Sequence, residues 1–252
     1  MEDGIVVKSN VLEIFEKQLI VKAKKRQYGF IAVGSATDAY MHHEEKWKLT
    51  EGILQLLLKY RFPVFISTKS TLILRDIELL KQIDKAAILP GDLRETLNRG
   101  AILSVSVSTT DDKITNMLEP RAASPLERFK IVRQLKEEGF LAGVNAIPTL
   151  PFISDTGEEL EKTIGMAKEH LADYILVGGL TLFGAEAADS KTLYFNFLKR
   201  YDPSLIPKYE NLYGVNYFAP KEYLRELKVK AERICTKVKI RPTILNLNVE
   251  AT

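Results

Sequence analysis

Small hydroxyl, acidic and basic side chains follow several apolar segments of the sequence, each at the point where the apolar segment ends. The first segment ends in Gly34-Ser35-Ala36-Thr37-Asp38 and the second in Ser67-Thr68-Lys69. The same change of character recurs later, at Ser106 and Ser108, at Asn145 and Thr149, and at Gly178, Gly179 and Thr181. Hydroxyls beside a lysine suit a ligand that carries a carboxylate or a phosphate. Two simpler readings stay open: the hydroxyls could cap the helices that follow, and Lys69 could be a solvated loop residue.

The elements that must position these residues alternate along the chain. Short apolar runs rich in β-branched residues predict strands within 29–35, 63–68, 101–108, 141–150 and 174–182. Helical periodicity between them predicts helices over 49–60, 73–83, 125–138 and 158–171. Such alternation is typical of βαβ units with a parallel sheet, where ligands bind at the carboxyl ends of the strands. Periodicity alone leaves a doubly wound sheet and a barrel equally open.

One helix has a start and an end that can be predicted from single residues. Ser124 precedes Pro125 and is followed by Glu127, which is the pattern of a capping box with proline at the first helical position. Gly139 stands where a glycine ends a helix. We therefore expect a helix between these two positions.

Composition limits the classes of protein that the chain can belong to. The 252 residues are 46% hydrophobic and carry a net charge of +3, so nucleic acid is permitted but not demanded. No apolar run reaches the ~20 residues of a membrane span, and the first ten residues are too polar for a signal peptide, so we expect a cytoplasmic protein with no membrane partner. Cys235 is the only cysteine, which excludes an intrachain disulfide and any intrachain site built from several thiolates.

Other chemical motifs are missing or weak. His42 and His43 are adjacent and cannot chelate one metal as an i, i+4 pair on a helix would. The glycine pair Gly178-Gly179 lacks the spacing of a phosphate loop or a Rossmann fingerprint, and the sequence has no GxSxG nucleophile elbow.

Three ordered stretches carry a resemblance to a known family. They are "GSATDAY", "LTEGILQLLLKYRFPVFISTKSTLILRDIELL" and "SVSVSTTDDKITNMLEPRAASPLERFKIVRQLKEEGFLAGVNAIPTLPFISD". In this order they resemble the radical S-adenosylmethionine proteins of the spore photoproduct lyase type, often labelled DNA repair photolyases. The resemblance implies an α/β fold, a partial (β/α)6 TIM-like barrel that lacks its first strand and cluster loop, over residues 1–182. Residues 183–252 would be a helical C-terminal extension packed on the barrel.

The resemblance also implies roles for single residues. Ser35, Ala36 and Thr37 would line the methionine end of S-adenosylmethionine, and Lys69 would reach its carboxylate. Ser106 would contact the ribose or methionine part, and the backbone of Ala146, Ile147 and Pro148 would hold the adenine. The residues left available to a substrate are Asp38, Tyr40, Arg121 and Asn145. Arg121 could equally be a structural ion-pair partner.

Two departures from the family affect the expected activity. The family holds a [4Fe–4S] cluster with a C-x3-C-x2-C loop after its first strand, and these cysteine ligands are absent from this chain. We expect a truncated product, with a true loss of the redox centre as the other explanation; as given, the chain is inactive in radical chemistry. Ala36 stands where spore photoproduct lyases have a hydrogen-donating cysteine, so we do not expect a spore photoproduct lyase in the strict sense.

Three functions remain open at this stage. The first is a radical S-adenosylmethionine enzyme, lyase-like, or its cofactor-binding part. The second is a non-catalytic barrel that binds S-adenosylmethionine or a nucleotide without a cluster, and the third is a conventional barrel enzyme that uses Lys69 as a Schiff-base or phosphate lysine. Without a preceding strand, segment 29–35 would form a sheet edge with unpaired backbone groups, so self-association is a further expectation.

Overall fold

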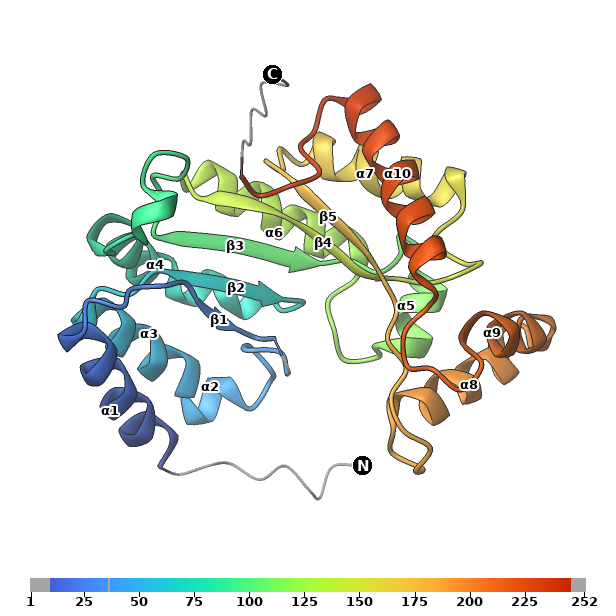
Figure 1. Cartoon of the computed structure of the whole chain (residues 1–252), viewed down its shortest axis with the longest axis horizontal. Helices are drawn as coiled ribbons and strands as arrows, with labels where there is room; N and C mark the ends of the chain where they lie inside the picture. The colour runs from blue at the N-terminus through green and yellow to red at the C-terminus, as the bar shows by residue number, and fades with distance from the viewer. Residues whose placement is uncertain (1–9, 36, 246–252) are drawn as a thin grey trace. The chain divides into compact units, whose positions relative to one another are not determined.

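The computed structural model describes residues 10–35 and 37–245. Five strands alternate with helices: β1 (Ile31–Val33), β2 (Val64–Thr68), β3 (Ala101–Ser106), β4 (Leu141–Thr149) and β5 (Ile175–Gly179). The helices are α1 (Val11–Lys24), α2 (Glu44–Trp47), α3 (Leu49–Tyr60), α4 (Ile77–Ala86), α5 (Asp112–Leu118), α6 (Pro125–Glu137), α7 (Gly157–Glu169), α8 (Ser190–Tyr201), α9 (Ile206–Tyr213) and α10 (Lys221–Val238). Three short 3-10 helices, Thr71–Asp76, Gly91–Leu93 and Pro203–Leu205, complete the described elements. All five predicted strands are confirmed (Figure 1).

The strands form one sheet in the order β1-β2-β3-β4-β5. β1 pairs with β2 in parallel, with Ile31 opposite Val64, and β4 pairs with β5 in parallel, with Val144 opposite Ile175. This order confirms the predicted α/β class with parallel strands, and it places β1 at one end of the order, as expected for segment 29–35. Closure into a (β/α)6 barrel stays a prediction, because the order has two ends among the described strands.

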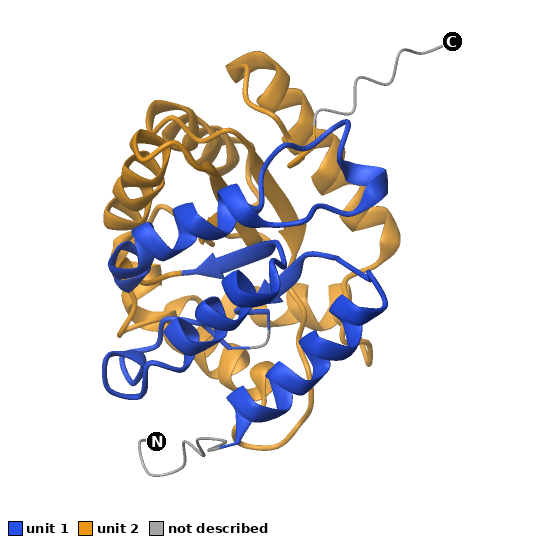
Figure 2. Cartoon of the chain, turned by 90° about the vertical axis from the view of Figure 1, so that its left-hand side faces the viewer, with its two compact units in different colours: residues 1–68, 72–103 blue, residues 69–71, 104–252 orange. Residues whose placement is uncertain are grey.

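The chain divides into two compact units (Figure 2). Unit 1 comprises residues 1–68 and 72–103, and unit 2 comprises residues 69–71 and 104–252. β1 and β2 lie in unit 1, and β4 and β5 lie in unit 2. The predicted boundary at residue 182 does not coincide with this division and stays a prediction.

Unit 1 is built on the buried faces of β2, α3 and α4. Val64 and Ile66 alternate with less buried neighbours along β2, which is the period of a strand, while Leu54 and Leu57 are buried three residues apart on α3. Helix α3 packs against α1 on one side and α4 on the other. The predicted helix over 73–83 divides in two, because a 3-10 turn over Thr71–Asp76 comes before α4.

Unit 2 has an apolar core with a tyrosine cluster at one end. Tyr194, Tyr209 and Tyr213, from α8 and α9, pack with apolar side chains that precede residue 183, including Leu150 and Leu182. The helices after residue 183 therefore share a core with earlier elements of the same unit. Helix α10 packs on α7 and on β5 (Figure 1).

The start of α6 confirms the predicted capping box. The Ser124 hydroxyl accepts from the backbone N–H of Glu127, and the Glu127 carboxylate accepts from the backbone N–H of Ser124 at 2.8 Å. Gly139 adopts φ +86° just after the helix, a left-handed conformation that favours glycine. No helix among the described residues is both long enough and apolar enough to cross a membrane.

Candidate functional site

The turn that follows β1 depends on a glycine. Gly34 has φ +91°, and a Cβ atom there would overlap the carbonyl oxygen of Ser67 at the end of β2. The backbone of the two strand ends can therefore approach closely only at a residue without a side chain. Ser35 and Thr37, which follow, are exposed. Ala36 lies outside the described residues, so its predicted contact with the cofactor stays a prediction.

Asp38 ties the turn to the neighbouring strand within unit 1. Its carboxylate oxygen Oδ1 accepts from the Thr68 hydroxyl at 2.6 Å and from the backbone N–H of Tyr40 at 2.8 Å. The Tyr40 side chain is only 1% exposed. Burial, together with the nearby Asp76 carboxylate, raises the pKa of the Tyr40 hydroxyl far above its usual value, so this hydroxyl stays protonated. Substrate contact by Asp38 and Tyr40 stays a prediction.

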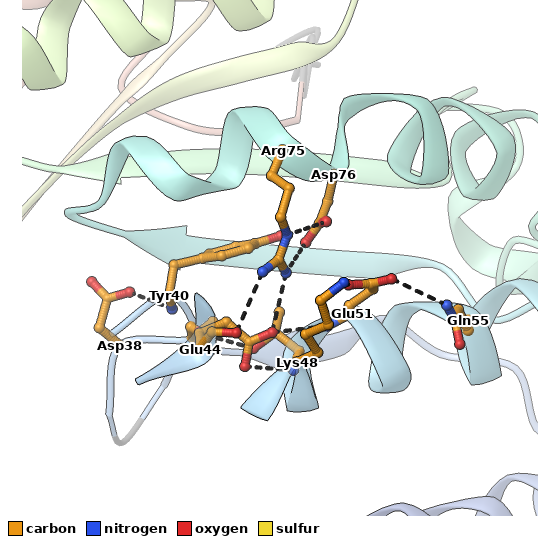
Figure 3. Close-up of polar contacts among 10 residues, drawn as sticks. Asp38, Tyr40, Glu44, Lys48, Glu51, Gln55, Arg75 and Asp76 are labelled. Carbon is orange, nitrogen blue, oxygen red and sulfur yellow. Dashed lines mark hydrogen bonds and ion pairs between the residues drawn. The ribbon is translucent and has the colours of Figure 1, made fainter. Parts of the chain in front are cut away.

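A charged network that sequence reasoning missed lies beside Tyr40 (Figure 3). The buried Glu44 carboxylate accepts from the backbone N–H groups of Thr50 and Glu51 in the first turn of α3, at 3.0 and 3.2 Å. Arg75 Nη2 lies 3.1 Å from Glu44 Oε1, and Arg75 Nε lies 2.8 Å from Asp76 Oδ1. Glu44 thus serves α3 as an N-terminal cap and serves Arg75 as a counter-ion.

A groove of about 620 Å³ lies along β1 in unit 1. Its apolar lining includes Phe15 from α1, Val33 from β1 and Trp47 from α2, and its polar lining includes Ser35 and Asp38. The lining is therefore mainly apolar along the strand, with polar residues at the strand's carboxyl end and, from α2 and α3, Glu44 and Thr50.

In unit 2, Lys69 directly follows β2 and belongs to a chain of charges. Its Nζ atom lies 3.5 Å from Glu119 Oε1, and the side chain is 32% exposed. Glu119 Oε2 lies 2.7 Å from Nη2 of Arg128 on α6, a side chain that is 1% exposed. Sequence reasoning missed both partners, although "LEPRAASPLER" contains them nine residues apart. Lys69 is thus held at the strand end and keeps part of its surface open.

The other predicted residues of unit 2, apart from Arg121, lie on β3 and β4. Ser106 is the last residue of β3 and is buried, and its carbonyl accepts from Arg128 Nη1 at 3.1 Å. On β4, the carbonyl of Asn145 accepts from the backbone N–H of Val107 at 3.0 Å, and the carbonyl of Ala146 accepts from the Thr149 hydroxyl at 2.8 Å.

Ile147 is an exposed apolar residue near the end of β4. Its side chain is 42% exposed and covers Gly178 on β5, where a Cβ atom would come within 3.0 Å of it. Pro148, which follows through a cis peptide bond, is half-buried. Arg121 is exposed on the segment between α5 and α6. An open apolar side chain beside backbone groups suits the face of a purine ring.

The residues of this chain do not fit an iron–sulfur cluster. Such a cluster needs three thiolates, and the sequence holds one cysteine, Cys235. Cys235 is buried on α10, and burial raises the pKa of its thiol to about 11, so the side chain is a neutral thiol at pH 7. Among the described residues, no group of three histidine, cysteine or acidic side chains could hold a metal ion.

The cofactor S-adenosylmethionine fits the residue types at the strand ends better than a cluster does. A cation, hydroxyls and an exposed apolar residue correspond to its carboxylate, ribose and adenine groups. The predicted cofactor contacts among the described residues lie near the carboxyl ends of their own strands: Ser35 and Thr37 after β1, Lys69 after β2, Ser106 at the end of β3, and Ala146, Ile147 and Pro148 within the last four residues of β4. The prediction that these ends share one pocket involves residues of both units and stays a prediction.

Comparison with solved structures identifies the fold. A cysteine-to-serine mutant of spore photoproduct lyase matches 90% of this chain and 64% of its own length, with a TM-score of 0.58 and 13% sequence identity. A double mutant of that enzyme, with bound AdoMet and dinucleoside spore photoproduct, matches with the same values. The fold is similar to that of a radical S-adenosylmethionine enzyme. At this identity the likeness concerns the fold alone.

Comparison by sequence finds longer relatives. Uncharacterized proteins of Mycobacterium tuberculosis and Mycobacterium bovis are 26% identical over 236 residues, which is 94% of this chain and 64% of each relative. An uncharacterized protein of Methanocaldococcus jannaschii is 26% identical over 164 residues, which is 65% of this chain and 53% of that relative. The chain thus spans less than two thirds of the length of the mycobacterial relatives. No protein-family model matches the chain.

Proposed function

We propose that this chain binds S-adenosylmethionine and is the cofactor-binding part of a radical S-adenosylmethionine protein of the spore photoproduct lyase-like group. The observation that carries the proposal is the position of Lys69. It follows a strand of a five-stranded parallel sheet, in a fold similar to that of spore photoproduct lyase, and its side chain is 32% exposed. The carboxyl end of a parallel strand is where such folds bind ligands.

The proposal gives each strand end a part of the cofactor. Lys69 binds the carboxylate, and Ser35, Ala36 and Thr37 line the methionine end. Ser106 contacts the ribose or methionine part through its backbone or hydroxyl. The backbone of residues 146–148 and the exposed side chain of Ile147 hold the adenine. Substrate then contacts the remaining predicted polar residues, namely Asp38, Tyr40, Arg121 and Asn145.

Radical chemistry is outside what these 252 residues can supply. When a cluster is bound, the family's enzymes cleave S-adenosylmethionine reductively, and this chain lacks the three thiolates that hold it. We therefore propose the lyase-like reaction and its DNA substrate only for a protein that also contains the three cluster-binding cysteines. A cluster-free protein that binds S-adenosylmethionine or a nucleotide is the second candidate, and the single buried thiol of Cys235 favours it.

Calorimetric titration of the chain with S-adenosylmethionine tests the proposal. We expect binding by the wild type and about tenfold weaker binding by Lys69→Met, since loss of a charge-assisted contact of this kind is worth about 1.4 kcal/mol. The matched control is Lys81→Met, which removes a partly exposed lysine of α4 that pairs with Glu78 at 3.1 Å. Failure of the wild type to bind, or equal weakening in both variants, would contradict the proposal.

A second measurement tells which ligand the chain prefers and whether the chain itself supports cleavage of S-adenosylmethionine. ATP and S-adenosylmethionine are titrated into the same preparation, and after cluster reconstitution the mixture is assayed for 5′-deoxyadenosine under reducing conditions. Binding of S-adenosylmethionine without its cleavage is the expected result for this chain. Formation of 5′-deoxyadenosine would show that the chain itself can hold a working cluster, and it would contradict the statement that the chain lacks the cluster ligands.

A further inference from the structure

Arg128 in unit 2 is a fully buried guanidinium that contacts the end of β3 and the segment between α5 and α6. The side chain is 1% exposed. Nε donates to the carbonyl of Ala123 at 2.7 Å, and Nη1 donates to the carbonyl of Ser106, at the end of β3, at 3.1 Å. A buried cation is costly unless it is paired and hydrogen-bonded. Nε and Nη1 are hydrogen-bonded, whereas Nη2 makes no hydrogen bond within the described part of the chain and is paired by charge with the Glu119 carboxylate.

Glu119 joins this buried cation to Lys69. Oε2 of Glu119 lies 2.7 Å from Arg128 Nη2, while Oε1 lies 3.5 Å from Lys69 Nζ. Glu119 is 23% exposed and Lys69 is 32% exposed, so exposure rises along the series from the interior outward. The three side chains therefore alternate in sign and carry one net positive charge, with Lys69 as the outermost cation.

The net charge decides what Lys69 can bind. With Glu119 as its only neighbour, Lys69 would be part of an ion pair with no net charge, and Glu119 would compete with any anion for the ammonium group. Arg128 balances the negative charge of Glu119 from the buried side. The positive charge of Lys69 is therefore left to attract a ligand.

We propose that Arg128 is a positioning residue for the cofactor carboxylate, acting through Glu119 on Lys69. This inference rests on the proposed function, since it concerns the same strand end. It assigns Arg128 no contact with the ligand. The simpler reading is that Arg128 only ties β3 to the segment between α5 and α6, in which case its loss would lower stability without affecting any one group of the ligand.

Two ligands that differ by one carboxylate separate these readings. The dissociation constants of S-adenosylmethionine and of decarboxylated S-adenosylmethionine are measured by calorimetry for the wild type and for Arg128→Met. We expect Arg128→Met to weaken binding of S-adenosylmethionine about tenfold, because the charge of Glu119 is then unbalanced. The affinity for decarboxylated S-adenosylmethionine should change less than about twofold. The control Lys136→Met removes another α6 cation, which lies 2.6 Å from Asp173, and leaves the ratio of the two constants unchanged.

A second substitution gives a further test, because it should restore affinity only if Arg128 acts through the charge of Glu119. In Arg128→Met/Glu119→Gln the competing charge is gone, so we expect affinity for S-adenosylmethionine to return to within about threefold of the wild type, although the protein is no more stable. Glu119→Gln alone, which keeps Arg128 and its backbone contacts, keeps the design informative if Arg128→Met fails to fold. It is expected to bind S-adenosylmethionine at least as tightly as the wild type.

The outcomes are distinguishable. Equal weakening of both ligands in Arg128→Met, or weakening of S-adenosylmethionine binding by Glu119→Gln to the level of Lys69→Met, overturns the positioning role and leaves the proposed function standing. No binding of either ligand by the wild type overturns both proposals.

Discussion

Two acidic side chains in this protein hold the local backbone in place by accepting from backbone N–H groups. Glu44 is the clearest case, because it caps α3 through two backbone N–H groups and also pairs with Arg75. Asp38 has a similar role between the turn after β1 and Thr68 at the end of β2. Both carboxylates therefore hold a turn or a helix start in place beside the proposed site.

Replacement of Glu44 tests this role. Glu44→Gln should lower the free energy of unfolding by about 2 kcal/mol, because Arg75 loses one of its two acidic partners among the described residues and keeps only Asp76, and because the amide group accepts less well from the α3 N–H groups. Glu45→Gln, at the adjacent exposed position, should change it by less than about 0.5 kcal/mol. Urea unfolding followed by circular dichroism measures both. Equal stability of the two variants would show that the network contributes little.

At the scale of elements, β1 is a short strand with one unpaired edge among the described residues. Ile31 donates to the carbonyl of Pro63 at 2.9 Å, and successive residues of a strand alternate in direction, so the N–H and C=O of Ala32 face away from β2. The mainly apolar groove lies along this strand. Self-association through this edge stays a prediction, which the oligomeric state in light scattering would test.

Proline scanning distinguishes the two sides of β1. Ala32→Pro removes an N–H that β2 does not use and should cost about 1 kcal/mol or less, whereas Ile31→Pro removes the bond to Pro63 and should cost about 3 kcal/mol. Chemical unfolding of the two variants, monitored by the fluorescence of Trp47 beside the groove, gives the comparison. If Ala32→Pro proves the more damaging of the two, the direction assigned to the strand's edge is wrong.

At the scale of the whole molecule, buried tyrosines make stability depend on alkaline pH. Tyr209 donates to the carbonyl of Pro151 at 2.5 Å and contacts the Tyr194 hydroxyl at 2.8 Å. Burial, followed by neighbouring hydroxyls, raises the pKa of Tyr209 well above its usual value near 10. Because the pKa is raised in the folded state, the stability that protonated Tyr209 contributes is fully present below about pH 10 and is lost as pH rises above that value.

The variant Tyr209→Phe measures that contribution. Between about pH 10 and 12 the free energy of unfolding of the wild type should fall more steeply than that of Tyr209→Phe, by about 1.4 kcal/mol per pH unit, since one fewer group ionises on unfolding of the variant. At pH 7 the variant should be less stable by about 1 kcal/mol, for the lost hydrogen bonds. Urea unfolding at several pH values gives both quantities. Parallel curves for the two proteins would contradict the assignment.

The sequence by itself determined the features that depend on neighbours in the chain. Apolar runs with β-branched residues located the five strands, and Ser124 with Glu127 located the start of α6, because strand periodicity and helix capping act over a few residues. The polar residues at the strand ends could be chosen in the same way, since parallel strands with helical connections bind ligands at those ends.

Only the tertiary structure decided which side chains support those strand ends. The Lys69–Glu119 and Arg128–Ser106 contacts join residues 50 and 22 positions apart, and the Glu44–Arg75 pair joins residues 31 apart. No local pattern records such a distance, because a charged residue has the same propensities whether solvent or a buried partner faces it. The burial of Tyr40 likewise follows from the packing of unit 1 and not from the polar turn in which the residue lies.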